Sequence, residues 1–122
     1  MEPVGVDRVL GDAEMAFREF LEETLDHPLV PRQRIAFNCV LAVSVLGKDL
    51  FIEWIQSLIP EKGNAGKVMT FLCALADKHK VRLVLDAIPC GEPRIPKRKL
   101  MAFYRRYGFR WTKEDEMVRE VK

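Results

Sequence analysis

The sequence predicts a single α/β domain in which an antiparallel β-hairpin leads into a β-loop-α-β unit. Apolar residues alternate with a period of two over residues 35–45, and Gly47-Lys48 then suits a two-residue hairpin turn before a second apolar strand. Farther on, apolar residues recur with helical spacing over residues 65–78, and a β-branched run follows at residues 81–87. A strand, a helix and a strand in so few residues form a crossover, so these two strands are expected to be parallel.

The composition indicates one globular domain, residues 1–122. Hydrophobic residues make up 48% of the chain and charged residues 31%, which is the profile of a folded protein rather than a disordered one. No apolar run approaches the roughly 20 residues that cross a bilayer. The opening residues, MEPVGVD, lack the features of a signal peptide. We therefore expect a cytoplasmic protein with no membrane partner.

The cysteines and histidines do not predict a metal site. Cys39, Cys73 and Cys90 are odd in number and have no metal-ligand spacing, so reduced thiols are expected. His27 and His79 lie far apart in the sequence and lack clustered partners.

The positive charge is concentrated near the end of the chain. Residues 93–113 contain eight basic residues and no acidic one, and because the whole chain has a net charge of +2, the remaining residues carry −6. Such a block suits an anionic partner, namely a phosphate-bearing cofactor, a nucleic acid or an acidic protein, or it is only a solvated face. Its members are Arg94, Lys97, Arg98, Lys99, Arg105, Arg106, Arg110 and Lys113.

The elements follow in order from these patterns. Residues 12–25 are predicted to form an amphipathic helix with Asp12 as its N-cap. Residues 35–45 are predicted as one continuous strand and residues 49–58 as the next. After the helix at 65–78 and the strand at 81–87, Pro96 suits the start of a last helix and Gly108 its end. Its apolar stripe is Leu100, Phe103, Tyr104 and Tyr107, and short strands are expected at 109–111 and 117–121.

The loop before the central helix is a candidate phosphate site. Gly63 and Gly66 let the backbone turn and approach a ligand, while Lys62 and Lys67 add positive charge where a helix begins. The alternative is an ordinary loop in which Asn64 caps the helix.

The segment KLMAFYRRYGF, residues 99–109, resembles the signature near the end of the GNAT superfamily of acetyl-CoA-dependent N-acetyltransferases. The resemblance extends over residues 49–121, because that family also places a strand, a glycine-containing loop, a long helix and a parallel strand before the signature. The small size resembles that of compact acetyltransferases of phages and prophages. The resemblance implies a mixed, mostly antiparallel sheet with a central βαβ unit and helices on both faces.

The resemblance also implies where acetyl-CoA binds. Loop amides would hold the pyrophosphate and the end of the preceding strand would hold the pantetheine arm. Pro60 departs from the family pattern, which opens with arginine or glutamine. The implied binding residues are Leu58, Lys62, Gly63, Asn64, Ala65, Gly66, Lys67 and Tyr104.

Two catalytic residues follow from the same resemblance. Tyr104 matches the tyrosine that protonates the leaving thiolate, although it is also a core residue of its helix. Glu53 lies on the strand that carries a general base in some members; apolar neighbours would raise its pKa, or it is a surface carboxylate.

The implied reaction moves an acetyl group from acetyl-CoA to an amine by direct attack. The short segments around the acceptor side suit a protein lysine or N-terminus, while a small amine or a pocket completed by a homodimer partner remain alternatives. In a different class of function, the chain would be an inactive GNAT-like module whose basic helix contacts nucleic acid or a partner protein. The helix aromatics fall on its buried stripe, which disfavours nucleic acid.

Overall fold

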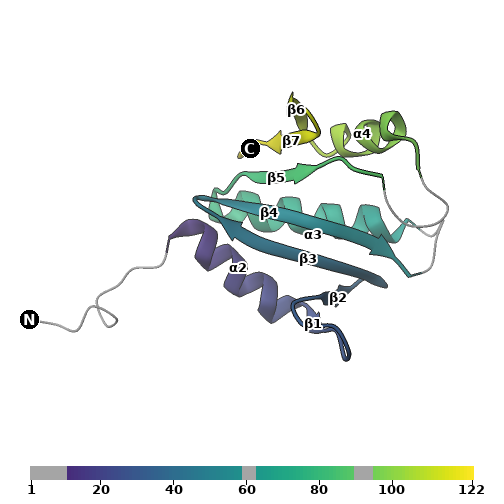
Figure 1. The fold of residues 1–122 in the computed structure, drawn as a ribbon. Coiled ribbons are helices and arrows are strands. Elements are labelled where there is room, and N and C mark those ends of the chain that lie inside the picture. Colours follow the sequence, from purple (N-terminus) through teal and green to yellow (C-terminus); the bar gives the residue numbers. More distant parts are fainter. Residues whose placement is uncertain (1–10, 59–62, 90–94) are drawn as a thin grey trace, which may run out of the picture.

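The computed structural model describes residues 11–58, 63–89 and 95–122 (Figure 1). In this part of the chain a seven-stranded sheet is combined with three helices. The elements are α2 (Asp12–Glu23), β1 (Leu25–Asp26), β2 (Arg34–Ala36), β3 (Cys39–Leu46), β4 (Asp49–Ser57), α3 (Asn64–His79), β5 (Leu83–Asp86), α4 (Lys97–Arg105), β6 (Arg110–Lys113) and β7 (Glu116–Arg119).

The sheet is mixed and mostly antiparallel, as predicted. Its strand order is β1-β2-β3-β4-β5-β7-β6, and β4 with β5 is its parallel pair of neighbours. The other neighbouring strands are antiparallel. The expected βαβ unit is therefore present as β4-α3-β5, and the Gly47-Lys48 turn joins β3 to β4 with Gly47 at a φ of +63°.

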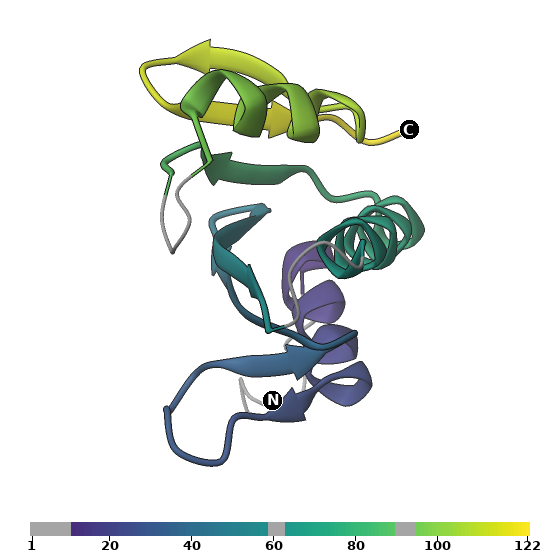
Figure 2. The same ribbon diagram turned by 90° about the vertical axis from the view of Figure 1, so that its right-hand side faces the viewer.

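The helices gather toward one face of the sheet. Helices α2 and α3 lie on the same face of the sheet (Figure 2), and the end of α4 also reaches α3, because the Cys73 thiol donates to the Tyr107 carbonyl at 3.8 Å. Strands β5 and β6 run parallel with β7 between them. The connections through α3 and α4 thus step the same way across the sheet, and right-handed connections of that kind place their helices on one face.

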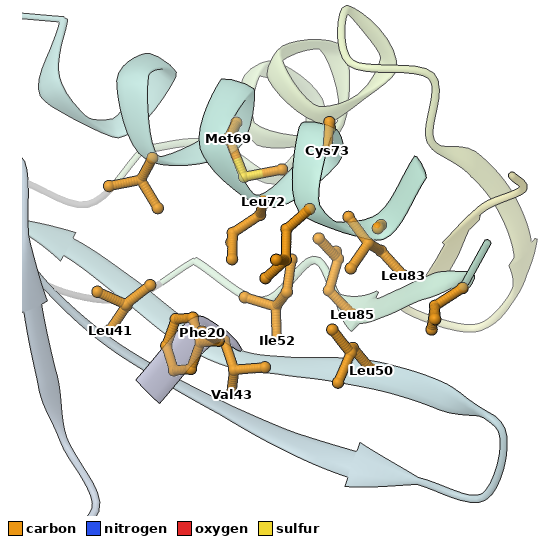
Figure 3. Packing of buried hydrophobic residues seen from close by; sticks show 14 of the residues in the cluster. Phe20, Leu41, Val43, Leu50, Ile52, Met69, Leu72, Cys73, Leu83 and Leu85 are labelled. Atoms are coloured by element: carbon orange, nitrogen blue, oxygen red, sulfur yellow. The ribbon is translucent and has the colours of Figure 1, made fainter. Parts of the chain in front are cut away.

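A continuous hydrophobic core fills the space between α2, α3 and the sheet. Side chains from α3 point toward the strands, and Phe20 of α2 packs beside them (Figure 3). The predicted buried stripe of α3 is confirmed in full, with Val68, Met69, Leu72, Leu75 and Ala76 all buried. Helix α3 is the longest described helix, and its 16 residues fall short of the roughly 20 that span a membrane.

The predicted continuous strand over residues 35–45 is wrong, because the chain turns at Phe37 and Asn38. Both residues have positive φ, 52° and 58°, which is the backbone of a tight two-residue hairpin turn. Asn38 tolerates this conformation, and the half-exposed Phe37 side chain stays outside the buried core. Strands β2 and β3 therefore pair with each other, with Ala36 opposite Cys39.

The helix boundaries also differ from those expected. Gly11 rather than Asp12 is the N-cap of α2, and its N–H donates to the Glu14 carboxylate at 3.0 Å. The helix ends at Glu23, since Arg34 donates to the carbonyls of Leu21 and Thr24 and so satisfies the C-terminal end.

An ion pair fastens the end of the chain to α3. Arg119 of β7 is 4% exposed, and its guanidinium donates to both Asp77 carboxylate oxygens at 2.9 Å. Its Nε also donates to the Tyr107 carbonyl at 2.8 Å, so one side chain joins β7, α3 and the end of α4. The hydrogen bonds from Arg119 hold the pKa of Asp77 below its usual value of 3.8.

We expect Asp77→Asn to lower the free energy of unfolding by about 3 kcal/mol at neutral pH, because it leaves a buried guanidinium without its counter-charge. The matched control is Asp49→Asn, whose partner Arg82 is 46% exposed, so the loss should stay below about 1 kcal/mol. Denaturant unfolding measures both losses.

The same pair predicts a pH dependence. A carboxyl with a lowered folded-state pKa stabilises the fold above its unfolded pKa, and this stabilisation is lost as the pH falls through the folded-state pKa. The difference in the free energy of unfolding between the wild type and Asp77→Asn should therefore become smaller as the pH falls into the acidic range. A difference that stays constant with pH would contradict this account of the pair.

Candidate functional site

The candidate site is a cleft where β4 and β5 part. The two strands pair only from Leu50 to Ile52 and from Leu83 to Leu85, while β4 continues to Ser57. Beyond the last pair the strands enclose a cleft of about 620 Å³ that α4 and the segment after β5 also line. Its walls are largely apolar, and it has the size of a small-molecule site.

A β-bulge lies at the point where the strands part. Ala42 and Val43 are adjacent in β3, but their partners in β4 are Trp54 and Ile52, so Glu53 is the extra residue. A bulge leaves that residue out of the ladder and bends its strand. It also changes which side chains face the core, so Ile52 and Ile55 both pack against the core although they are three residues apart.

The structure brings both predicted catalytic residues to this cleft. Glu53 lines it from β4 and Tyr104 lines it from α4. The Tyr104 ring is half-buried and packs edge-on against Phe103 and tilted against Phe109, with ring centroids 5.3 and 5.7 Å apart. Tyr104 is therefore fixed by the core and reaches the cleft at the same time, so its two predicted roles are compatible.

Glu53 has a partner that the sequence did not reveal. Arg32, in the loop between β1 and β2, donates to the Glu53 carboxylate at 3.1 Å. The Arg32 side chain is largely exposed and that of Glu53 is about one-third exposed. Because the two residues are 21 positions apart, only the fold brings them together, and no local motif marks Arg32.

Asp86 is a second carboxylate on the opposite wall. It is the exposed last residue of β5 and lines the cleft. Within the described residues it forms no ion pair, unlike Glu53. In the sequence, Asp86 directly follows the apolar residues Leu83, Val84 and Leu85, and this position was the available signal.

The predicted cofactor loop is only partly described. Lys62, together with Pro60, lies outside the described residues. Gly63 caps α3 at a φ of 71° with open space around its Cα, and it replaces Asn64, which is the buried first residue of the helix rather than its cap. Ala65 and Lys67 lie in the first turn, and Leu58 is 57% exposed just after β4. Cofactor binding by these residues stays a prediction.

Gly66 has a packing role in the structure. A Cβ atom at this position would stand 2.7 Å from the Tyr107 hydroxyl oxygen, which is too close for a real contact. Glycine at position 66 thus lets the end of α4 approach the first turn of α3.

The thiols do not form a second candidate site. Cys39 and Cys73 are buried, and burial raises the pKa of both, which disfavours the reactive thiolate. Cys90 lies outside the described residues. Among the described side chains no group of histidine, cysteine and carboxylate residues could hold a metal ion.

The comparisons with known proteins support the fold and leave the chemistry open. No family model matches the sequence, and no curated protein is significantly similar to it. Among solved structures, the anti-CRISPR protein AcrVA5 is similar, with a TM-score of 0.61 and 14% identity over 70% of this chain and 94% of that chain. At this identity the likeness shows a shared fold.

The contact between Gly66 and Tyr107 can be tested by a double-mutant cycle. Alanine in place of glycine favours a helix by up to about 1 kcal/mol, but here the new methyl group displaces the Tyr107 hydroxyl. We therefore expect the change in the free energy of unfolding caused by Gly66→Ala to be less favourable in the wild-type background than in the Tyr107→Phe background, by about 1 kcal/mol. Equal effects in the two backgrounds, measured by denaturant unfolding, would show that the hydroxyl does not constrain position 66.

Proposed function

We propose that this protein is an N-acetyltransferase that moves an acetyl group from acetyl-CoA to an amine in the cleft between β4 and β5. The observation that carries the proposal is the convergence of Tyr104 and Glu53 at the point where the two parallel strands part. Both residues are also the ones to which the sequence resemblance assigns catalytic roles. A shared fold with AcrVA5 is consistent with the proposal.

The strand β4 offers a binding edge for the pantetheine arm. From Trp54 to Ser57, β4 pairs with β3 on one side, whereas its pairing with β5 on the other side has ended at Ile52. Backbone N–H and C=O groups on that second side can pair with the amides of an extended ligand. The N-terminal end of α3, capped by Gly63, favours the pyrophosphate. Acetyl-CoA supplies the thioester, whose acetyl carbon becomes bonded to the amine nitrogen as its bond to sulfur breaks.

The residues around the cleft supply proton transfer. A tyrosine hydroxyl can act as a general acid, and that of Tyr104 would give its proton to the departing sulfur. Asp86 or Glu53 would take the proton that the amine loses, and the Arg32 pair makes Glu53 the less available of the two. The bulge at Glu53 leaves backbone groups of β4 outside the ladder, where an N–H can stabilise a developing oxyanion.

The charge of the cleft favours a cationic acceptor. Among the residues that the structure describes, the charged ones in its lining are Glu53 and Asp86, one on each wall, and the rest of that lining is mostly apolar. A protonated primary amine carried on an apolar stem, such as a lysine side chain, fits that combination.

Binding of acetyl-CoA is the first test. At about a hundred times its dissociation constant the ligand should add about 2.7 kcal/mol to the free energy of unfolding, seen as a thermal shift. Ile88→Trp should abolish the shift, because Ile88 is 56% exposed and lines the cleft. Leu29→Trp is the matched control at an exposed position outside the lining and should keep the shift. Failure of acetyl-CoA to shift the wild type would overturn the proposal.

The role of Tyr104 is tested by Tyr104→Phe. We expect kcat to fall by about 10²-fold or more, with little change in acetyl-CoA affinity, because the variant keeps the ring and loses the proton donor. Tyr107→Phe, in the turn after α4 and outside the cleft lining, should keep kcat within a few-fold of wild type. If the two variants are equally active, the proton comes from elsewhere.

A further inference from the structure

Helix α4 carries exposed basic side chains that do not line the cleft. We call four of them the basic face: Arg98, Lys99, Arg105 and Arg106. Arg110 and Lys113 of β6 are also exposed, but they lie opposite Val118 and Glu116, so their side chains are on the other face of the sheet from that of the core residue Met117. Within this stretch Lys97 is paired with Asp115, and the Arg106 guanidinium lies 5.2 Å from the centre of the Phe103 ring. None of the basic-face residues forms an ion pair with a described carboxylate.

Helix α4 and the β6–β7 hairpin lie alongside each other. The Lys97–Asp115 pair ties the start of α4 to the β6–β7 turn. At the other end, only residues 106–109 separate the end of α4 from the start of β6. Both views show α4 next to the β6–β7 hairpin (Figures 1 and 2).

The first turn of α4 carries basic residues at positions where a helix is stabilised by acidic ones. Lys97, Arg98 and Lys99 are its first three residues, and the first turn contains no acidic residue. The N-terminal end of a helix carries partial positive charge, so acidic residues stabilise it and basic residues do not. Basic residues at the start of a helix reduce its stability, and such an unfavourable local choice is typical of a functional surface.

Trp111 adds an exposed aromatic ring to this surface. Its exposed fraction is 55%, although tryptophan is among the most costly side chains to leave in water. Trp111 lies opposite Met117, which is buried in the core, so its side chain is on the face of the sheet that carries the helices. The indole N–H donates to the Glu114 carbonyl at 2.8 Å, so the ring is held while its face stays open.

We propose that the basic face and Trp111 together bind single-stranded nucleic acid, a function that goes beyond acetyl transfer. Phosphates would contact the basic face, and an unpaired base would stack on the Trp111 ring. The residues outside 93–113 carry a net charge of −6, which repels a polyanion from the rest of the protein and favours its approach to this region. A duplex offers no unpaired base to the ring, so the single strand is the better partner. The aromatics on the buried stripe of α4 take no part.

The two tryptophans make the test specific. The chain contains only Trp54, which lines the cleft, and Trp111. In Trp54→Phe the remaining fluorescence reports Trp111, and a short oligothymidylate should quench it on binding. Fluorescence anisotropy of the labelled oligonucleotide measures affinity, which should fall with salt at a slope of about −0.7 per phosphate contact in a log–log plot.

Matched variants separate charge and stacking. Trp111→Ala should weaken oligothymidylate binding about tenfold, while Trp111→Phe should keep most of the affinity. Arg98→Glu should weaken binding several-fold without loss of thermal stability, since an acidic residue suits the start of a helix. Lys48→Glu, in the β3–β4 turn, makes the same charge change outside the basic face and should have little effect.

Several outcomes would overturn the proposal. They are no binding of the wild type, equal affinities of Arg98→Glu and Lys48→Glu, unchanged Trp111 fluorescence on binding, and a duplex bound as tightly as the single strand. Displacement of the oligonucleotide by CoA would also overturn it, because the basic face would then belong to the cofactor site. Acetyl-CoA binding to the cleft is measured separately, so either proposal can fail alone.

Discussion

The site depends on the parting of two parallel strands that remain paired for only three residues. Burial of Ile52 and Leu85 on the core side holds the strands together up to that point. The bulge at Glu53 then bends β4, which stays paired with β3, while β5 continues toward α4. The cleft begins directly beyond this junction, so the buried core positions the two strands that form its walls.

Sequence patterns predicted the elements whose periodicity is uninterrupted and failed where a turn or bulge lies inside an apolar run. The stripe of α3 and the parallel β4–β5 pair were predictable because burial imposes their spacing. The turn at Phe37-Asn38 was hidden because apolar alternation continues through it. The bulge left a readable sign, since Ile52 and Ile55 are both apolar at a spacing that one face of a regular strand cannot provide.

The candidate site was only partly accessible from the sequence for a different reason. Tyr104 and Glu53 lie in segments that resemble a known family, so their positions could be proposed. Arg32 enters the site through a long-range contact that no local pattern encodes, whereas Asp86 directly follows an apolar run and becomes part of the site because the strands diverge there. Arg119 is similar: it reads as one more basic residue near the end of the chain, yet it is buried and joins three elements.

Strand β6 is an outer edge of the sheet, and such edges are open to pairing with a second copy of the chain. The strand is four residues long, its register shifts between Trp111 and Lys113, and its ends carry Arg110 and Lys113. Shortness, irregularity and like charge each oppose sheet-to-sheet association. Arg110 and Lys113 therefore help to protect this edge, and a sequence that lost them would have to protect it in another way.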